Sequence, residues 1–85
     1  MSEHILKVLS PDWRAIERGD QTFLVHHNDR DFQLGDIVVL KLIEAGVFAP
    51  TIAGLPELRK RISYIVAGAA NVFMSLEDEL VHSDE

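Results

Sequence analysis

Cysteine is absent from this chain of 85 residues, and tryptophan and tyrosine occur once each. Without cysteine, disulfides, thiolate zinc sites and cysteine nucleophiles are excluded, which favours a reducing compartment. No segment approaches the about 18 consecutive apolar residues of a membrane-spanning helix, and the N-terminus has no basic start followed by an apolar run. We therefore expect a cytoplasmic protein that is neither secreted nor inserted in a membrane.

Motifs that hold cofactors or metals are also lacking. The sequence has no glycine loop that would bind a phosphate, no serine-centred elbow and no paired carboxylates at a catalytic spacing. His26 and His27 are adjacent, so on a strand their side chains point to opposite faces and cannot chelate one metal together. We expect neither a metal nor another cofactor.

The residues that are present are typical of one small soluble domain. Hydrophobic residues make up 47% of the chain and charged residues 26%, as in ordinary globular proteins. A chain of this length buries only roughly 60 to 65% of its unfolded surface, so its core is modest.

The net charge of −6 is concentrated near the C-terminus. Residues 1–76 hold all 8 Lys and Arg with 9 of the 14 acids, whereas residues 77–85 hold the other five acids. We therefore predict a nearly neutral domain over residues 1–76 and a flexible acidic tail over residues 77–85. The tail is either a solvated chain end or a contact for a basic partner.

Helix signals follow a first short strand. Residues 4–9 alternate as a strand does, and residues 11–19 predict a helix. Ser10 is expected to cap this helix, Pro11 suits its first turn, and a left-handed Gly19 would end it.

Strand signals fill the rest of the chain. The strongest is DIVVLKLI at residues 36–43, which is rich in branched residues and is expected to be a central strand. In the strand over residues 58–67, strict alternation places Ile62, Tyr64 and Val66 on one face. The remaining expected elements are strands over residues 21–26 and 71–76, a tight turn at 44–46 and an irregular edge segment at 47–52.

One helix and about five strands in so short a chain predict an α+β fold. The expected architecture is a small β-barrel of five to six strands with one main helix after the first strand. Closure of the barrel would remove exposed sheet edges.

Several segments also carry a family resemblance. They are HILKVLSPDW at the start, GDQTF at residues 19–23, NDRDF at residues 28–32, the following GD, and RKRISYIV with NVFMSL near the end. In this order the chain resembles the ASCH domains of the PUA-like barrel superfamily, in their small prokaryotic and phage branch of unassigned function, over most of residues 4–76. The resemblance implies a small barrel with a cleft beside the helix that binds RNA, a modified nucleoside or a related ligand. One branch has amidohydrolase activity.

The chain departs from that family at the positions that carry chemistry. The ASCH signature has Gly, Lys, Glu and Arg where this sequence has Gly19, Gln21, Leu24 and His26. Gln does not titrate and Leu carries no charge, so hydrolysis of the family type is not expected. His26 still offers a hydrogen bond or a conditional charge.

The candidate ligand contacts are Gln21, Thr22, His26, Arg30 and Trp13. Thr22 and His26 share the strand face that lines the cleft in the family, and His26 is also a weak catalytic candidate. Arg30, within the NDRDF turn, either fixes the turn by pairing with an aspartate or reaches an anionic ligand. Trp13 either covers the core or stacks on a base.

Four arginines form a candidate nucleic-acid surface. Arg14 and Arg18 lie four residues apart on the predicted helix, and Arg59 and Arg61 share one face of a strand. If the two pairs converge they offer a modest surface for a polyanion, and if they diverge they are solvated faces.

Three hypotheses for function follow. The leading one is a non-catalytic module that binds RNA, a nucleoside or a small anionic ligand in the cleft. The second is an amidohydrolase of nucleoside-like amides in which His26 replaces the missing Lys and Glu. The third is a protein-interaction or inhibitor module from a mobile element, whose acidic tail engages a basic partner.

Overall fold

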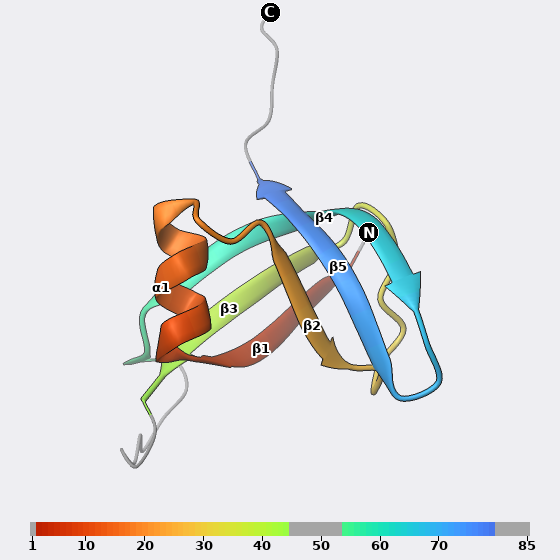
Figure 1. Ribbon diagram of the computed structural model, residues 1–85, viewed down its shortest axis with the longest axis horizontal. Coiled ribbons are helices and arrows are strands. Elements are labelled where there is room, and N and C mark those ends of the chain that lie inside the picture. The colour runs from red at the N-terminus through yellow and green to blue at the C-terminus, as the bar shows by residue number, and fades with distance from the viewer. Residues whose placement is uncertain (1, 45–53, 80–85) are drawn as a thin grey trace, which may run out of the picture.

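A five-stranded sheet forms the framework of the protein in a computed structural model, which describes residues 2–44 and 54–79. The sheet curls into a half-barrel, and a single described helix packs on its inner side (Figure 1). The expected small barrel-like α+β fold is thereby confirmed. The elements in chain order are β1 (Glu3–Leu9), α1 (Ser10–Arg18), β2 (Phe23–His27), β3 (Ile37–Ile43), β4 (Glu57–Ala67) and β5 (Asn71–Asp78).

The strand order across the sheet is β1-β3-β4-β5-β2. β1 and β3 run parallel, and every other neighbouring pair is antiparallel. The order therefore begins at β1 and ends at β2, and within the described residues no ladder joins these two edges. The expected closure of the barrel is wrong at this point.

The helix follows β1 without a linker. Ser10 is already helical and Leu9 occupies the cap position without a side-chain cap bond, so the expected capping role of Ser10 is wrong. The end of α1 is as predicted. Gly19 has a φ of 85°, and its N–H donates to the Ile16 carbonyl at 3.1 Å, a left-handed turn that glycine adopts without a Cβ penalty.

The core lies between α1 and the inner face of the sheet. Trp13 and Ile16 are only 3% and 2% exposed, and Trp13 Nε1 donates to the Leu40 carbonyl at 2.9 Å. β3 is buried along nearly its whole length, which confirms that the branched, apolar segment is central. The inner face of the sheet adds Leu6, Val8, Val38, Leu42, Ile62, Val72, Met74 and Leu76.

A β-bulge interrupts the alternation of β4. The register with β5 shifts between Ile62 and Tyr64. Ile62 is buried, Ile65 packs against the core, and Tyr64 and Val66 are 58% and 51% exposed. The expectation that Ile62, Tyr64 and Val66 share a face is therefore wrong, because the extra residue of a bulge reverses the facing of those that follow.

The predicted boundary after residue 76 falls inside β5. Glu77 and Asp78 belong to this strand and pair with Arg61 and Lys60 of β4. Their side chains accept hydrogen bonds from the same two residues, Glu77 from Arg61 at 2.6 Å and Asp78 from Lys60 at 2.7 Å. The predicted edge segment at residues 47–52 and most of the turn at 44–46 lie outside the described residues, as do residues 80–85 of the acidic tail.

Candidate functional site

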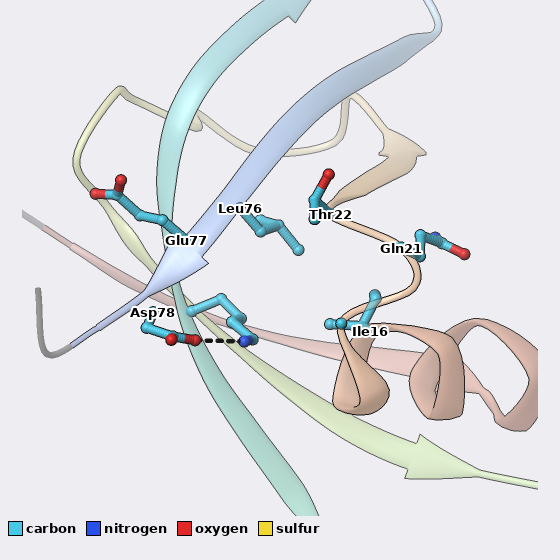
Figure 2. Close-up of a pocket in the computed structure, with 8 residues that line it drawn as sticks. Ile16, Gln21, Thr22, Leu76, Glu77 and Asp78 are labelled. Atoms are coloured by element: carbon cyan, nitrogen blue, oxygen red, sulfur yellow. Dashed lines mark hydrogen bonds and ion pairs between the residues drawn. The ribbon is translucent and has the colours of Figure 1, made fainter.

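A hollow of about 410 Å³ lies beside the C-terminal end of α1 (Figure 2). Three parts of the fold form it: the end of the helix, the link from α1 to β2, and the adjoining ends of β4 and β5. The residues that line it are Ile16, Gly19, Gln21, Thr22, Lys60, Leu76, Glu77 and Asp78. Two of the predicted ligand contacts, Gln21 and Thr22, thus lie at one hollow.

The hollow has an apolar floor and a polar rim. Ile16 and Leu76 are 2% and 8% exposed and extend toward one another from α1 and β5 (Figure 2). The Leu76 N–H donates to the Thr22 carbonyl at 2.8 Å, which ties the link before β2 to β5. Because this wall is held by backbone bonding, the main chain at Thr22 has a fixed position beside the hollow.

An ion pair forms the opposite side of the rim. Lys60 Nζ donates to Asp78 Oδ1 at 2.7 Å, and the Lys60 side chain is 19% exposed whereas that of Asp78 is 81% exposed. The hydrogen bond and charge of Lys60 hold the pKa of Asp78 below its usual value. A ligand in the hollow therefore meets a cation and a carboxylate that already neutralise one another.

His26 does not line the hollow, but it shares a structural role with Gln21 at the edge of β2. Thr22 and Asn28 bond to β5 through their backbones, so by alternation the carbonyls of Phe23 and His27 face away from β5. Gln21 Nε2 donates to the Phe23 carbonyl at 2.9 Å, and His26 Nδ1 lies 3.0 Å from the His27 carbonyl. These two side chains thus cover polar groups on the outer edge of β2.

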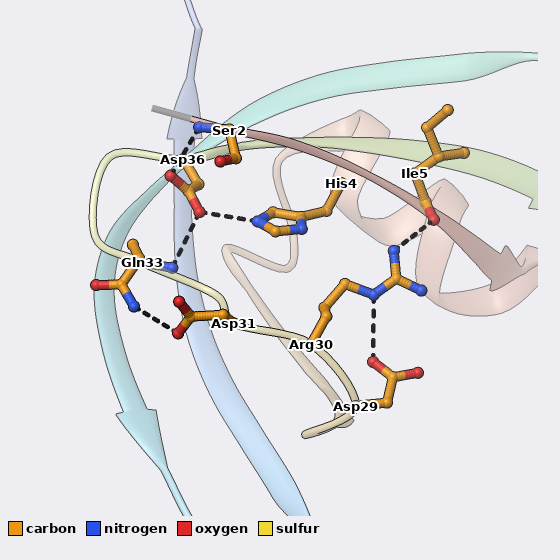
Figure 3. A network of polar contacts seen from close by, with 8 residues as sticks. All are labelled: Ser2, His4, Ile5, Asp29, Arg30, Asp31, Gln33 and Asp36. Atoms are coloured by element: carbon orange, nitrogen blue, oxygen red, sulfur yellow. Dashed lines mark hydrogen bonds and ion pairs between the residues drawn. The ribbon is translucent and has the colours of Figure 1, made fainter.

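Arg30 covers a backbone carbonyl at the other edge of the sheet, on β1. The Ile37 N–H bonds the Ser2 carbonyl, so alternation turns the Ile5 carbonyl away from β3. Arg30 Nη1 donates to that Ile5 carbonyl at 3.3 Å, while Arg30 Nε donates to Asp29 at 3.2 Å (Figure 3). Among the described residues that line the hollow, neither Arg30 nor His26 occurs.

The loop between β2 and β3 contributes Asp36 to a buried pair of polar side chains that was not among the sequence-based predictions. His4 Nε2 lies 2.8 Å from Asp36 Oδ2, and the two residues are 8% and 3% exposed (Figure 3). The other bonds to Asp36 come from the backbone N–H groups of Ser2 and Gln33, each at 3.0 Å. Burial raises the pKa of Asp36, but these three hydrogen bonds outweigh it and hold the pKa below its usual value.

The sequence did contain a signal for this pair. His4 has the same parity as the buried Leu6 and Val8 of β1, so it points inward. A polar side chain at such a position requires a buried partner, and the Asp36 that precedes the central strand supplies it. The pair fastens the start of β1 to the loop before β3, which is a structural role.

The comparison with protein families adds one assignment. The model of a family described as a domain of unknown function, DUF3850, matches residues 3–81. The chain belongs to the DUF3850 family. Among curated proteins, none matches this chain. The match spans all six elements of the DUF3850 domain, from β1 to β5, and so includes every residue that lines the hollow.

The four arginines of the predicted nucleic-acid surface are all paired in this DUF3850 domain. On α1, Arg14 lies 3.7 Å from Glu17 and Arg18 lies 2.9 Å from Asp20. On β4, Arg59 contacts both Glu3 and Glu79, and Arg61 contacts Glu77. The hydrogen bonds of Arg59 to Glu79 and Glu3 raise its pKa further above the usual value.

The two pairs of arginines also diverge. Leu58 and Ile62 of β4 face the core under α1, so Arg59 and Arg61 point to the outer side of the sheet. Arg14 and Arg18 belong to the helix on the inner side. The four cations therefore do not form one continuous surface.

Two further features of the DUF3850 domain bear on its partners. Within residues 2–44 and 54–79, no helix is both long and apolar enough to cross a membrane. In the same ranges, no three His, Asp or Glu side chains gather as a metal site requires.

Proposed function

We propose that this DUF3850 domain is a non-catalytic, PUA-like binding module of the ASCH type that holds a nucleoside-like ligand in the hollow beside α1. The observation that carries the proposal is the composition of the hollow: an apolar floor of Ile16 and Leu76 with Gln21 and Thr22 at the rim. Its volume of about 410 Å³ falls in the range of small-molecule sites. A nucleobase needs such a site, with an apolar contact for its face and polar groups for its edge.

The distribution of charge favours a nucleoside over a polynucleotide. Affinity for RNA grows with the number of phosphates that unpaired Lys and Arg neutralise. Arg14, Arg18, Arg59 and Arg61 each contact a carboxylate of the same chain. Lys60, the cation of the hollow, is likewise paired with Asp78. A neutral ligand that offers both hydrogen-bond donors and acceptors matches this surface better than a phosphate chain does.

The contacts of His26 and of the acidic residues favour binding over the two alternatives. An amidohydrolase that relied on His26 would need this side chain at the ligand, whereas His26 is not among the described residues that line the hollow. An acidic tail that captured a basic partner would need available carboxylates. Within the described part of the tail, residues 77–79, the three carboxylates of Glu77, Asp78 and Glu79 are already bonded to Arg61, Lys60 and Arg59.

A titration followed by amide chemical shifts tests the proposal. Pyrimidine and purine nucleosides are added to the labelled full chain, and saturable shifts are expected at Gly19, Gln21, Thr22 and Leu76. Thr22→Val keeps the shape of the side chain but removes its hydroxyl, so affinity should fall by roughly 2- to 13-fold, as for the loss of one hydrogen bond of about 0.5 to 1.5 kcal/mol.

Ser75→Ala is the matched control, because Ser75 lies on the outer face of β5 and its hydroxyl is remote from the hollow. It should leave the affinity unchanged. Absence of saturable shifts with every nucleoside would contradict the proposal. Release of a new product from an acylated nucleoside would instead favour the amidohydrolase.

A further inference from the structure

The outer face of β2, β5 and β4 carries a continuous apolar surface. Cross-strand partners place Val25, Phe73 and Val66 in one row, and Phe23, Ser75 and Tyr64 in the next. Phe23 and Phe73 stack diagonally between the rows with ring centres 5.5 Å apart. The five apolar members, here called the outer patch, are 37% to 58% exposed: Phe23, Val25, Tyr64, Val66 and Phe73.

The bulge in β4 creates half of this surface. Without the register shift between Ile62 and Tyr64, alternation would turn Tyr64 and Val66 toward the core. With the shift, Ile65 packs against the core instead, and the exposed side chains of Tyr64 and Val66 face outward beside Phe73. Bulges commonly re-aim side chains at functional places in sheets. This one adds apolar area to a face that would otherwise be narrower.

Charge changes abruptly at the border of the outer patch. All six positions of the two rows are uncharged, whereas the outer face toward the start of β4 carries Arg59 and Arg61. Those arginines are paired with Glu3, Glu79 and Glu77. The surroundings therefore present few unsatisfied charges that a foreign partner could recognise, and the patch complements an uncharged, apolar surface like itself.

We propose that a second copy of this chain covers the outer patch, forming a weak two-fold dimer in which the two sheets pack face to face. A two-fold axis pairs one patch with its own duplicate, so the required match of apolar to apolar surface is met automatically. Twisted sheets pack in this way in β-sandwiches. The inference is independent of the ligand in the hollow, which lies beside α1 on the inner side of the sheet.

The area of the outer patch sets the strength of the association. With about 200 Å² for an aromatic side chain and somewhat less for valine, the exposed fractions correspond to roughly 400 Å² per copy. Stable interfaces bury roughly 800 Å² per partner. The dimer is therefore expected in the range of weak complexes, with a dissociation constant on the order of 0.1 to 1 mM.

The net charge of −6 does not prevent this contact. Glu77, the outer-face acid two residues beyond Ser75, accepts a hydrogen bond from Arg61 at 2.6 Å, and Asp78 accepts one from Lys60 at 2.7 Å. The acids nearest the outer patch are therefore neutralised within their own chain. In a face-to-face pair with antiparallel β5 strands, the two acidic ends also point in opposite directions.

Sedimentation analysis of the full chain, from about 10 μM to about 1 mM at about 0.15 M salt, tests the proposal. The weight-average mass should rise from monomer toward dimer with concentration. Val66→Lys places a charge within the outer patch and should hold the chain as a monomer. Leu34→Lys makes the same change of charge at a side chain that is 64% exposed outside the patch, and it should associate as the wild type does.

Tyr64→Ser serves as a second variant that adds no charge, and circular dichroism verifies the fold of each. The mass rise should again diminish. A wild type that stays monomeric up to about 1 mM overturns the proposal and assigns the patch to a different occupant. Equal association of wild type, Val66→Lys and Tyr64→Ser overturns it as well. Nucleoside titration of the monomeric variant separates this outcome from failure of the ligand proposal.

Discussion

At the scale of single residues, buried polar side chains stabilise the ends of the sheet. Asp36 accepts hydrogen bonds from His4, Ser2 and Gln33 in a site that is nearly closed to solvent. A buried carboxylate is tolerated only when it is bonded in this way. Loss of its charge therefore weakens the attachment of β1 to the loop before β3.

Acid unfolding tests the role of Asp36. Its pKa in the fold lies below the unfolded value of about 3.9, so its stabilising contribution is complete above about pH 4 and is lost as the pH falls through the folded-state pKa. Asp36→Asn should lower the free energy of unfolding by about 1 to 3 kcal/mol at pH 7. The difference from wild type should shrink below about pH 4.

Urea unfolding followed at a series of pH values provides the measurement. Asp12→Asn is the control, because Asp12 is exposed in the first turn of α1. It should change stability far less at pH 7. A constant gap between wild type and Asp36→Asn from pH 7 down to about pH 2 would show that the Asp36 charge is not what stabilises the fold.

At the scale of elements, the two outer strands of the described sheet are protected by side chains. Gln21 and His26 bond carbonyls on the edge of β2, and Arg30 bonds a carbonyl on the edge of β1. Exposed strand edges pair readily with other chains. These three residues therefore have a structural function whether or not any of them also touches a ligand.

Removal of the edge contacts should promote strand-mediated aggregation. The double variant Gln21→Ala with His26→Ala uncovers the carbonyls of Phe23 and His27. Thioflavin fluorescence and light scattering on prolonged incubation should rise several-fold faster than for wild type. Gln33→Ala, which removes an exposed amide that bonds Asp31 in a loop, should behave as wild type. Equal rates for the double variant and the control would refute the protective role.

At the scale of the whole molecule, the local sequence determined the kind of fold but not its closure. The branched segment at residues 36–43 is indeed a buried interior strand, β3, and Gly19 ends the helix as its conformational freedom predicts. The parallel pairing of β1 with β3 and the open order of the sheet depend on contacts between distant segments. The local spacing of apolar residues does not predict such contacts. The bulge before Tyr64 likewise leaves no signature in a pattern of alternation.

The candidate site was predictable only in part for the same reason. Gln21 and Thr22 follow the helix directly, so their place beside α1 could be anticipated from sequence. Lys60 and Asp78 reach the hollow through the pairing of β4 with β5. Arg30 is separated from the hollow because its loop folds toward β1. Strand register therefore determines which polar residues meet at the hollow.

Binding of a nucleoside-like ligand in the hollow beside α1 is the central claim, and a crystal structure of the chain soaked with the best-binding nucleoside tests it most directly. The account predicts density for the base against the floor formed by Ile16 and Leu76, with polar contacts to Thr22 or Gln21. Density beside His26 and Arg30, or a hollow that remains filled only with solvent at saturating nucleoside, would contradict it.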